Sequence, residues 1–215
     1  MRVIIVAGGE LGDPHFYREL VSPADYIIAV NGGSAHALRI GLVPDLLIGD
    51  LDSLDQSLRE KVLALSKKVE EHPSEKDKSD LELAIDRAVA LGACEVLIFG
   101  ALGGPRVDHA LINLLLLQRL LEQGVGAKIV DPGSEVSLLQ GGQELTVIGC
   151  PGDLVSLFSL RGSAESVRTA GLKYGLDCED LLFASTRGLS NELLETEARI
   201  ALGKGLLMVI KSTGG

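Results

Sequence analysis

The sequence predicts an α/β N-terminal domain with a mostly parallel sheet flanked by helices, followed by an all-β sandwich. The first part of the 215-residue chain alternates short apolar runs with longer amphipathic stretches, which is the pattern of βαβ units. The strand candidates there are almost continuously apolar, as in parallel strands that are covered on both faces. The last part has short runs split by Gly, Asp or Pro and no long helical stripe, which is typical of a β-sandwich.

The expected strands of the first domain are short and rich in Val, Ile and Leu. They are "VIIVAG" (3–8), "YIIAVN" (26–31), "DLLIGD" (45–50), the less apolar "KKVEEH" (67–72), "CEVLIFG" (94–100) and "AKIVD" (127–131). Helices are expected between them, starting near Pro14, Ser34, Leu54, Ser79 and Val107. Right-handed crossovers would connect the parallel strands.

The pattern changes after "DPGS" at 131–134, so we place a domain boundary there, with domains at 1–131 and 132–215. The expected strands of the second domain lie in "EVSLLQGGQELTVIG", "DLVSLFSL", "ESVRTAGLKYGL", "DLLFAST" and "GKGLLMVIKS".

The composition argues against several classes of function. Thirty acidic and twenty basic residues give a net charge of −10 at pH 7, which disfavours nucleic acid and anionic membrane surfaces as partners. The three cysteines are far apart and form no CxxC pair, so they suggest neither a zinc site nor a disulfide framework. The opening apolar run is too short for a signal peptide or a membrane span, and we expect a cytoplasmic protein.

Two carboxylates follow the third expected strand. Side chains alternate along an extended chain, so Asp50 and Asp52 project to the same side at the carboxyl end of this strand, where open α/β sheets bind ligands. The alternative is that Asp52 or Ser53 only caps the next helix. Capping accounts for one acid but not for two.

A second acidic cluster lies in "SEKDKSDLELAIDRAVALG". Ser79 and Glu82 form a capping box, and Asp80 lies in the first turn, where the helix dipole favours a negative charge. This helix would begin at the same sheet edge as Asp50 and Asp52. Carboxylates that converge there, without His or Cys, suit Mg²⁺ with bound phosphate. A solvated acidic rim is the structural alternative.

Two glycine-rich turns favour a phosphate ligand. "VNGGSAHAL" leads from a strand into a helix through Gly32 and Gly33, and "GALGGPRVDHALINLL" does the same and adds Arg106. The chain has no GxxxxGK[ST] motif, so it is not a P-loop enzyme. "VAGGELG" after the first strand is a poor match to a dinucleotide-binding loop.

Several stretches together resemble the thiamine pyrophosphokinase family. They are "VNGGSAHALRIGLVPDLLIGDLDSL", "KDKSDLELAI", "GALGGPRVDHALINLLLL", "GLKYGLD" and "STRGLSNEL", in the family's order over nearly the whole chain. The resemblance implies transfer of the terminal diphosphate of ATP to the thiamine hydroxyl, giving thiamine diphosphate and AMP. It also implies Mg²⁺, a second domain for thiamine binding and dimerisation, and a homodimer with active sites at its interface.

The resemblance assigns roles to individual residues. Asp50, Asp52 and Asp80 become the metal and phosphate carboxylates, and Asp80 also orients or deprotonates the thiamine hydroxyl. Arg106 holds the transferring phosphate with Asp108 close by. The expected nucleotide contacts are Asn31, Gly32, Gly33, Lys78, Ser79, Gly103, Gly104 and His109. Ser190 and Asn191 would present polar groups to the thiamine pyrimidine from the partner subunit.

This chain departs from the family pattern at a few positions. Asn31 stands where the family usually has Asp, and it brings no charge to a cation. Pro105 is an extra residue before Arg106. The chain has no Trp, so Tyr174 is the nearest candidate for stacking on thiamine.

Two alternative functions remain open from the sequence. The same residues can serve a diphosphokinase for another hydroxyalkyl heterocycle, such as a hydroxymethyl-pterin, because acceptor contacts lie partly in the second domain. Alternatively, the changes at Asn31 and Pro105 fit a non-catalytic nucleotide-binding protein. The alcohol that consumes ATP and releases AMP distinguishes these functions.

Overall fold

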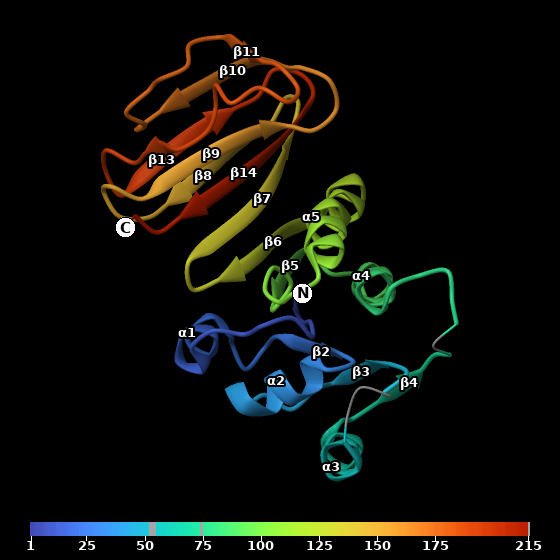
Figure 1. Ribbon diagram of the computed structural model, residues 1–215. Helices are drawn as coiled ribbons and strands as arrows, with labels where there is room; N and C mark the ends of the chain where they lie inside the picture. Colours follow the sequence, from blue (N-terminus) through green and yellow to red (C-terminus); the bar gives the residue numbers. More distant parts are fainter. Residues whose placement is uncertain (52–54, 74, 215) are drawn as a thin grey trace. The chain divides into compact units, whose positions relative to one another are not determined.

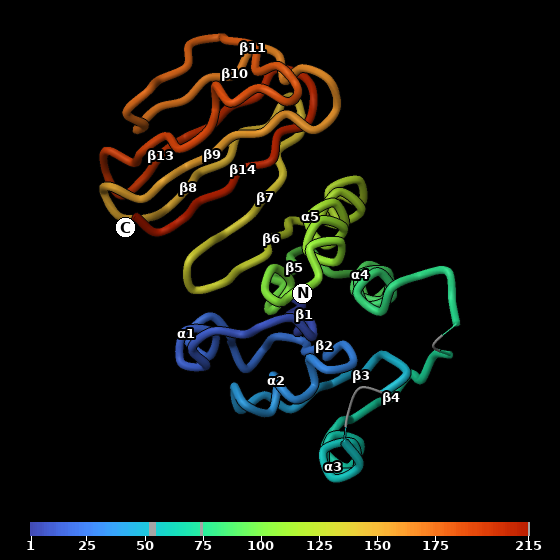
Figure 2. Tube along the Cα trace, in the orientation of Figure 1, coloured from blue at the N-terminus to red at the C-terminus, as the bar shows by residue number. Residues whose placement is uncertain are grey.

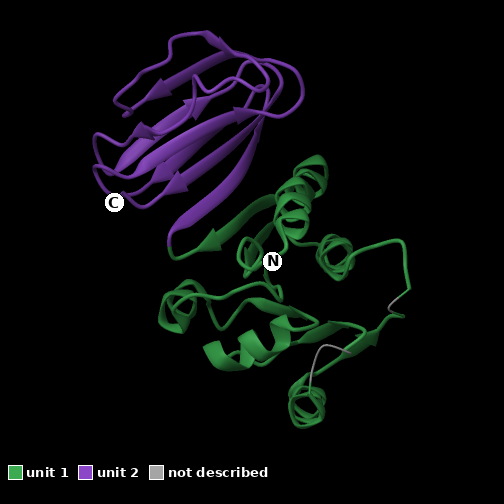
Figure 3. Cartoon of the chain, in the orientation of Figure 1, with its two compact units in different colours: residues 1–132 green, residues 133–215 purple. Residues whose placement is uncertain are grey.

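The computed structural model describes residues 1–51, 55–73 and 75–214, and the chain divides into two units, Met1–Pro132 and Gly133–Gly215 (Figure 3). The two units are described separately below. The predicted fold class is confirmed, because the first unit contains a parallel sheet with helices and the second contains antiparallel sheets.

The sheet of the first unit contains the strands that the apolar runs predicted, including the less apolar fourth one. They are β1 (Arg2–Val6), β2 (Tyr26–Val30), β3 (Leu46–Gly49), β4 (Val69–Glu71), β5 (Glu95–Phe99) and β6 (Gly126–Asp131). The order is β6-β5-β1-β2-β3-β4, and the neighbouring strands pair in parallel. The chain therefore changes direction across the sheet between β1 and β5. Such a switch point opens a crevice at the carboxyl ends of the strands.

Helices cover both faces of this sheet. They are α1 (Pro14–Leu20), α2 (Gly33–Ile40), α3 (Gln56–Leu65), α4 (Asp80–Ala90) and α5 (Val107–Glu122). Figure 1 shows α1, α2 and α3 on one face and α4 and α5 on the other. The buried strand residues on the first face, among them Ile4, Leu47 and Phe99, pack with Tyr17 of α1 and Val62 of α3. Because helices cover both faces of the sheet, side chains on both sides of each strand are buried, which explains why the strands are apolar throughout.

Side-chain caps set the start of three helices. Asp13 accepts a hydrogen bond from His15 N, and Ser79 accepts one from Glu82 N, as the predicted capping box requires. The third helix begins at Gln56 rather than near Leu54, because Asp55 is its cap and accepts from Leu58 N at 2.9 Å. The capping alternative named Asp52 and Ser53, which lie outside the described ranges, and the observed cap of this helix is Asp55.

The second unit is a β-sandwich. Its strands are β7 (Ser134–Gln140), β8 (Glu144–Ile148), β9 (Leu154–Ser159), β10 (Ala164–Ala170), β11 (Glu179–Leu181), β12 (Asn191–Glu192), β13 (Glu197–Ala201) and β14 (Leu206–Ser212). Figure 2 follows the chain through these strands. One antiparallel layer has the order β12-β9-β14-β7 and the other β11-β10-β13-β8. Buried residues of both layers, such as Leu157, Val209, Val167 and Ile200, form one core between them.

Within the described residues, no helix has the length and apolarity needed to cross a membrane. The strongly apolar stretch "LINLLLLQRLL" (111–121) forms part of α5.

Candidate active site at the switch point of the parallel sheet

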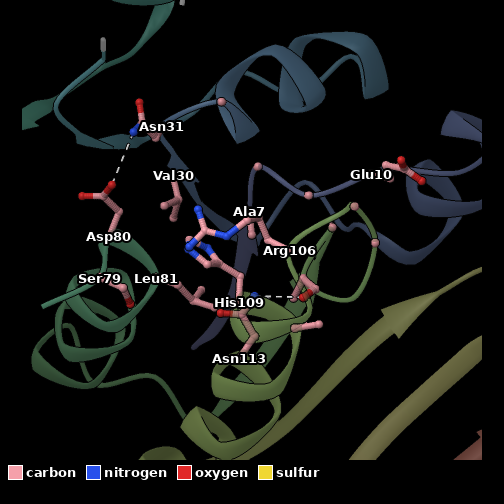
Figure 4. A pocket seen from close by; sticks show the side chains of 18 of the residues that line it. Ala7, Glu10, Val30, Asn31, Ser79, Asp80, Leu81, Arg106, His109 and Asn113 are labelled. Carbon is pink, nitrogen blue, oxygen red and sulfur yellow. Dashed lines mark hydrogen bonds between the residues drawn. The ribbon is translucent and has the colours of Figure 1, made fainter. Parts of the chain in front are cut away.

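A cavity of about 710 Å³ lies where the strand order of the first unit reverses (Figure 4). It is bordered by the loops after β1, β2 and β5, by the first turns of α4 and α5, and by His36 of α2. The lining residues are Ala7, Gly8, Gly9, Glu10, Val30, Asn31, Gly32, His36, Ser79, Asp80, Leu81, Gly100, Ala101, Gly103, Gly104, Pro105, Arg106, His109, Ala110, Ile112 and Asn113. The size and position suit a nucleotide-sized ligand.

Close backbone packing explains the glycines around this cavity. A Cβ on Gly9 would lie 2.6 Å from Gly100 O, and Gly9 N donates a hydrogen bond to that same oxygen. A Cβ on Gly33, at the first turn of α2, would lie 2.0 Å from Val6 O. The loops after β1 and β5 and the start of α2 therefore approach one another more closely than any other residue permits.

Asn31 and two acidic residues meet at one end of the cavity. Asn31 Nδ2 donates to Asp50 Oδ1 at 2.8 Å and to Asp80 Oδ2 at 3.4 Å. Figure 4 shows Asn31 and Asp80 facing each other along the second of these bonds. The predicted convergence of Asp50 and Asp80 is thus present, although β3 and α4 are far apart in sequence. Asp52 lies outside the described residues.

A cationic side chain contacts the same cluster. Lys76 Nζ lies 2.9 Å from Asp80 Oδ1, in an ion pair whose geometry is not that of a hydrogen bond, and both side chains are largely buried. Among the described residues, no group of three or more His, Cys, Asp or Glu side chains is arranged to hold a metal ion. The described part of the cluster therefore contains two carboxylates, an amide and an ammonium group.

Arg106 and Asp108 form an exposed pair at the start of α5. Arg106 donates to both oxygens of Asp108, from Nε at 2.9 Å and from Nη2 at 2.6 Å. These bonds hold the pKa of the Asp108 carboxyl well below its usual range. Arg106 lines the cavity, so its guanidinium binds a carboxylate, that of Asp108, at the edge of the pocket.

The other predicted nucleotide residues lie in two kinds of position. Gly32, Ser79, Gly103, Gly104 and His109 line the cavity. Lys78 Nζ instead lies 2.6 Å from Asp86 Oδ2, and Asp86 also accepts from Arg119 of α5 at 2.7 Å. The described contacts of Lys78 thus join it to a network between α4 and α5.

Sequence reasoning missed some lining residues. Gly8, Gly9 and Glu10 were considered only as a poor dinucleotide motif, although two glycines directly after a strand could have indicated the loop. His36 was not considered, and burial lowers the pKa of its imidazole, which is therefore neutral at pH 7. Asn113 donates from Nδ2 to Ala101 O at 2.8 Å and joins α5 to the loop after β5. The sequence offered no signal for His36 or Asn113, because tertiary packing brings them to the cavity.

Comparisons with known proteins identify the family. Residues 17–129, more than half of the chain, match the profile described as "Thiamin pyrophosphokinase, catalytic domain". The chain belongs to the thiamin pyrophosphokinase family. Residues 142–207 match a second profile of this family, described as "Thiamin pyrophosphokinase, vitamin B1 binding domain".

Individual thiamin pyrophosphokinases resemble the chain over most of its length. The enzyme of Bacillus subtilis is 27% identical over 186 residues, which cover 86% of each chain. A solved structure from Bacillus subtilis superposes with a TM-score of 0.89, at 27% identity over 99% of both chains. One from Geobacillus thermodenitrificans has a TM-score of 0.82, at 30% identity over 99% of this chain and 98% of that one. These similarities do not favour a pterin acceptor or a non-catalytic role.

The two candidate thiamine residues lie in the unit that matches the vitamin B1 binding domain. Ser190 is exposed, with a left-handed backbone (φ 54°), and its N–H donates to Ser156 Oγ at 3.0 Å. Asn191 is buried, and its amide bonds both backbone groups of Tyr174, from Nδ2 to Tyr174 O at 2.7 Å and from Tyr174 N to Oδ1 at 2.9 Å. Asn191 thus fixes the backbone that carries the exposed ring of Tyr174.

Proposed function

We propose that the chain is a thiamine diphosphokinase that transfers diphosphate from ATP to the thiamine hydroxyl, giving thiamine diphosphate and AMP. One observation carries the proposal. In a chain that matches both domains of the thiamin pyrophosphokinase family, Asp50 and Asp80 meet beside a glycine-lined cavity at the switch point of the sheet.

Asp80 is assigned to the acceptor hydroxyl. The thiamine oxygen attacks the β-phosphorus of ATP, the bond from this phosphorus to the bridging α–β oxygen breaks, and AMP leaves. The hydroxyl proton passes to a carboxylate, and Asp80 lies at the cavity with one oxygen that accepts no hydrogen bond from the described residues. Transfer of this kind depends mainly on positioning and charge stabilisation.

The acidic cluster fits Mg²⁺. Mg²⁺ prefers oxygen ligands and is commonly held by one or two carboxylates together with substrate phosphates. Asp50 and Asp80 provide two carboxylates within reach of one amide nitrogen, and the buried Oδ1 of Asp80 lies 2.9 Å from the ammonium group of Lys76. We assign both residues to the metal, with Asp52 as the third predicted ligand. Bound Mg²⁺ would neutralise phosphate charge.

The nucleotide is assigned to the remainder of the cavity. The loops with Gly32, Gly103 and Gly104 line the cavity and allow close approach of phosphates to the backbone, and Asn31, Ser79 and His109 add polar groups. Gly33, the fourth predicted glycine, starts α2 and packs against Val6 instead. Arg106 is assigned to phosphate, which would take the place that Asp108 occupies on its guanidinium. Lys78 remains a proposed ATP contact that would have to leave Asp86.

The thiamine contacts and the assembly are likewise proposals. Ser190 is assigned to the pyrimidine, with Asn191 acting through Tyr174. We expect a cytoplasmic homodimer with active sites at its interface, without nucleic acid or membrane partners. The net charge of −10 supports the last expectation.

The test is AMP release from the purified protein with ATP and Mg²⁺, with and without thiamine, together with mass detection of thiamine diphosphate. We expect AMP to depend on thiamine and the two products to form in equal amounts. ATP binding without AMP release would contradict the proposal, and so would AMP release that depends on a hydroxymethyl-pterin rather than on thiamine.

A further inference from the structure

We infer that Asn31 is a positioning residue. Its neutral amide donates hydrogen bonds to the two carboxylates that a cation would bind, so that the site binds its divalent cation together with the nucleotide rather than as the free ion. The inference rests on the proposed function, because it concerns the carboxylates assigned there to metal and phosphate. The observation that carries it is that one side-chain nitrogen, Asn31 Nδ2, donates to both Asp50 and Asp80.

The backbone of Asn31 is fixed independently of these contacts. Its N–H donates to Ile48 O at 2.8 Å, and its carbonyl accepts from Ser34 N at 3.0 Å and from Ser34 Oγ at 2.7 Å. Its φ of 47° is left-handed, a conformation that Asn, Asp and Gly adopt more readily than other residues. The anchored backbone places the amide between the carboxyl end of β3 and the start of α4.

Only the nitrogen of this amide can serve two carboxylates, since an ionised carboxylate accepts and does not donate. The Nδ2 group therefore partly offsets the repulsion between Asp50 and Asp80 when no metal is bound. A free cation that enters between them must displace these hydrogen bonds. A cation that arrives on a triphosphate also gains the phosphate contacts of the cavity, which the free ion lacks. Asn31 thus lowers affinity for the free ion while keeping the carboxylates in place.

Thermal unfolding of the full chain tests this inference without measuring activity. The midpoint Tm would be followed while Mg²⁺ alone is titrated at constant ionic strength, starting from EDTA. Asn31→Asp keeps the shape and removes the donor, and Asn31→Gly removes the side chain without straining the left-handed backbone. Gln56→Glu is the matched control, because Gln56 Nε2 donates to the Glu60 carboxylate at 3.1 Å on the exposed surface of α3.

We expect the Mg²⁺-induced rise in Tm to exceed that of the unchanged protein by about 3 °C in Asn31→Asp and by a smaller amount in Asn31→Gly. Gln56→Glu should respond as the unchanged protein does. A rise in Asn31→Gly that equals or falls below that of the unchanged protein would overturn the inference, because the amide would then be neutral toward the cation or would help to bind it. Thiamine diphosphate formation by the unchanged protein tests the proposed function separately.

Discussion

At the scale of single residues, the candidate site is held by side-chain hydrogen bonds that join distant parts of the chain. Asn31 joins the loop after β2 to Asp50 and Asp80, and Asn113 joins α5 to Ala101. Each bond places a polar group at the cavity with little rotational freedom. Substitutions that keep the shape but change one donor or acceptor should therefore affect chemistry more than folding.

Asp80→Asn should reduce turnover by about 10²–10⁴-fold, because the amide cannot accept the hydroxyl proton. Steady-state formation of thiamine diphosphate would measure the loss, and circular dichroism would check the fold. Asp86→Asn is the control on the same helix, since Asp86 pairs with Lys78 and Arg119. Near-normal turnover of Asp80→Asn would remove Asp80 from its assigned role.

Arg106→Lys should raise the KM for ATP about tenfold, because an ammonium group cannot donate two parallel N–H hydrogen bonds to a phosphate as a guanidinium does. Initial rates at varied ATP would measure it. Arg199→Lys is the matched control, since Arg199 is as exposed as Arg106, at 64%, and also pairs with a neighbouring acid, Glu197. An equal change of KM in both variants would show that Arg106 does not hold the nucleotide.

At the scale of secondary-structure elements, the cavity depends on how closely the loops after β1, β2 and β5 pack. The contacts around Gly9 and Gly33 leave no room for a side chain. The buried Tyr17 ring packs against Phe99 with centroids 5.0 Å apart, and its hydroxyl donates to Asp131 at 2.6 Å. The hydrogen bond joins α1 to the end of β6, and the ring contact joins α1 to β5, whose following loop lines the cavity.

Gly33→Ala should lower the free energy of unfolding by about 3 kcal/mol, because its Cβ would overlap Val6 O and push α2 away from β1. Urea denaturation would measure the change. Gly126→Ala is the control in the same unit, because a Cβ there would lie at an ordinary contact distance of 3.7 Å from Cys94 O. Equal stability of the two variants would mean that α2 can move without cost.

Tyr17→Phe should cost about 2 kcal/mol at pH 7, because Asp131 loses a donor while the aromatic packing stays. Burial raises the pKa of Asp131, so its ionised form is disfavoured in the folded state. Loss of the Tyr17 hydrogen bond should raise this pKa further. The destabilisation should therefore be larger at pH 7 than at pH 4, where Asp131 is partly protonated. Denaturation at both pH values checks this, and a larger loss at pH 4 would contradict it.

At the scale of the whole molecule, the two units differ in the groups they offer. The first unit contains the cavity, the glycine-rich loops and the acidic cluster. The second unit offers Ser190 and the exposed side chains of Tyr174, Leu182 and Phe183. This division fits a protein that binds nucleotide on one unit and an aromatic acceptor on the other.

Asn191→Ala should weaken thiamine binding about tenfold and leave ATP binding unchanged, because the Tyr174 backbone would lose both side-chain bonds. Calorimetric titration of the full chain would measure both affinities. Asn113→Ala is the reciprocal control, because Asn113 lines the cavity of the first unit. A loss of ATP affinity in Asn191→Ala that equals or exceeds its loss of thiamine affinity would show that the thiamine site is assigned to the wrong residues.

The sequence by itself determined the strands of the first unit and most of its helix starts, because burial on one face or on two leaves a period that can be read directly. It did not predict β12 and β13 of the second unit, which are short and are defined by their pairing with β9, β8 and β10. It also indicated Asp50, Asp80 and the glycine turns, since these residues stand at the ends of strands or the starts of helices. Only the tertiary structure decided which side chains meet. The double hydrogen bond of Asn31, the bond from Arg119 to Asp86, the burial of Asn191 and the place of His36 depend on contacts between distant segments. No local period or spacing encodes such contacts, because they follow from the order in which the strands pack.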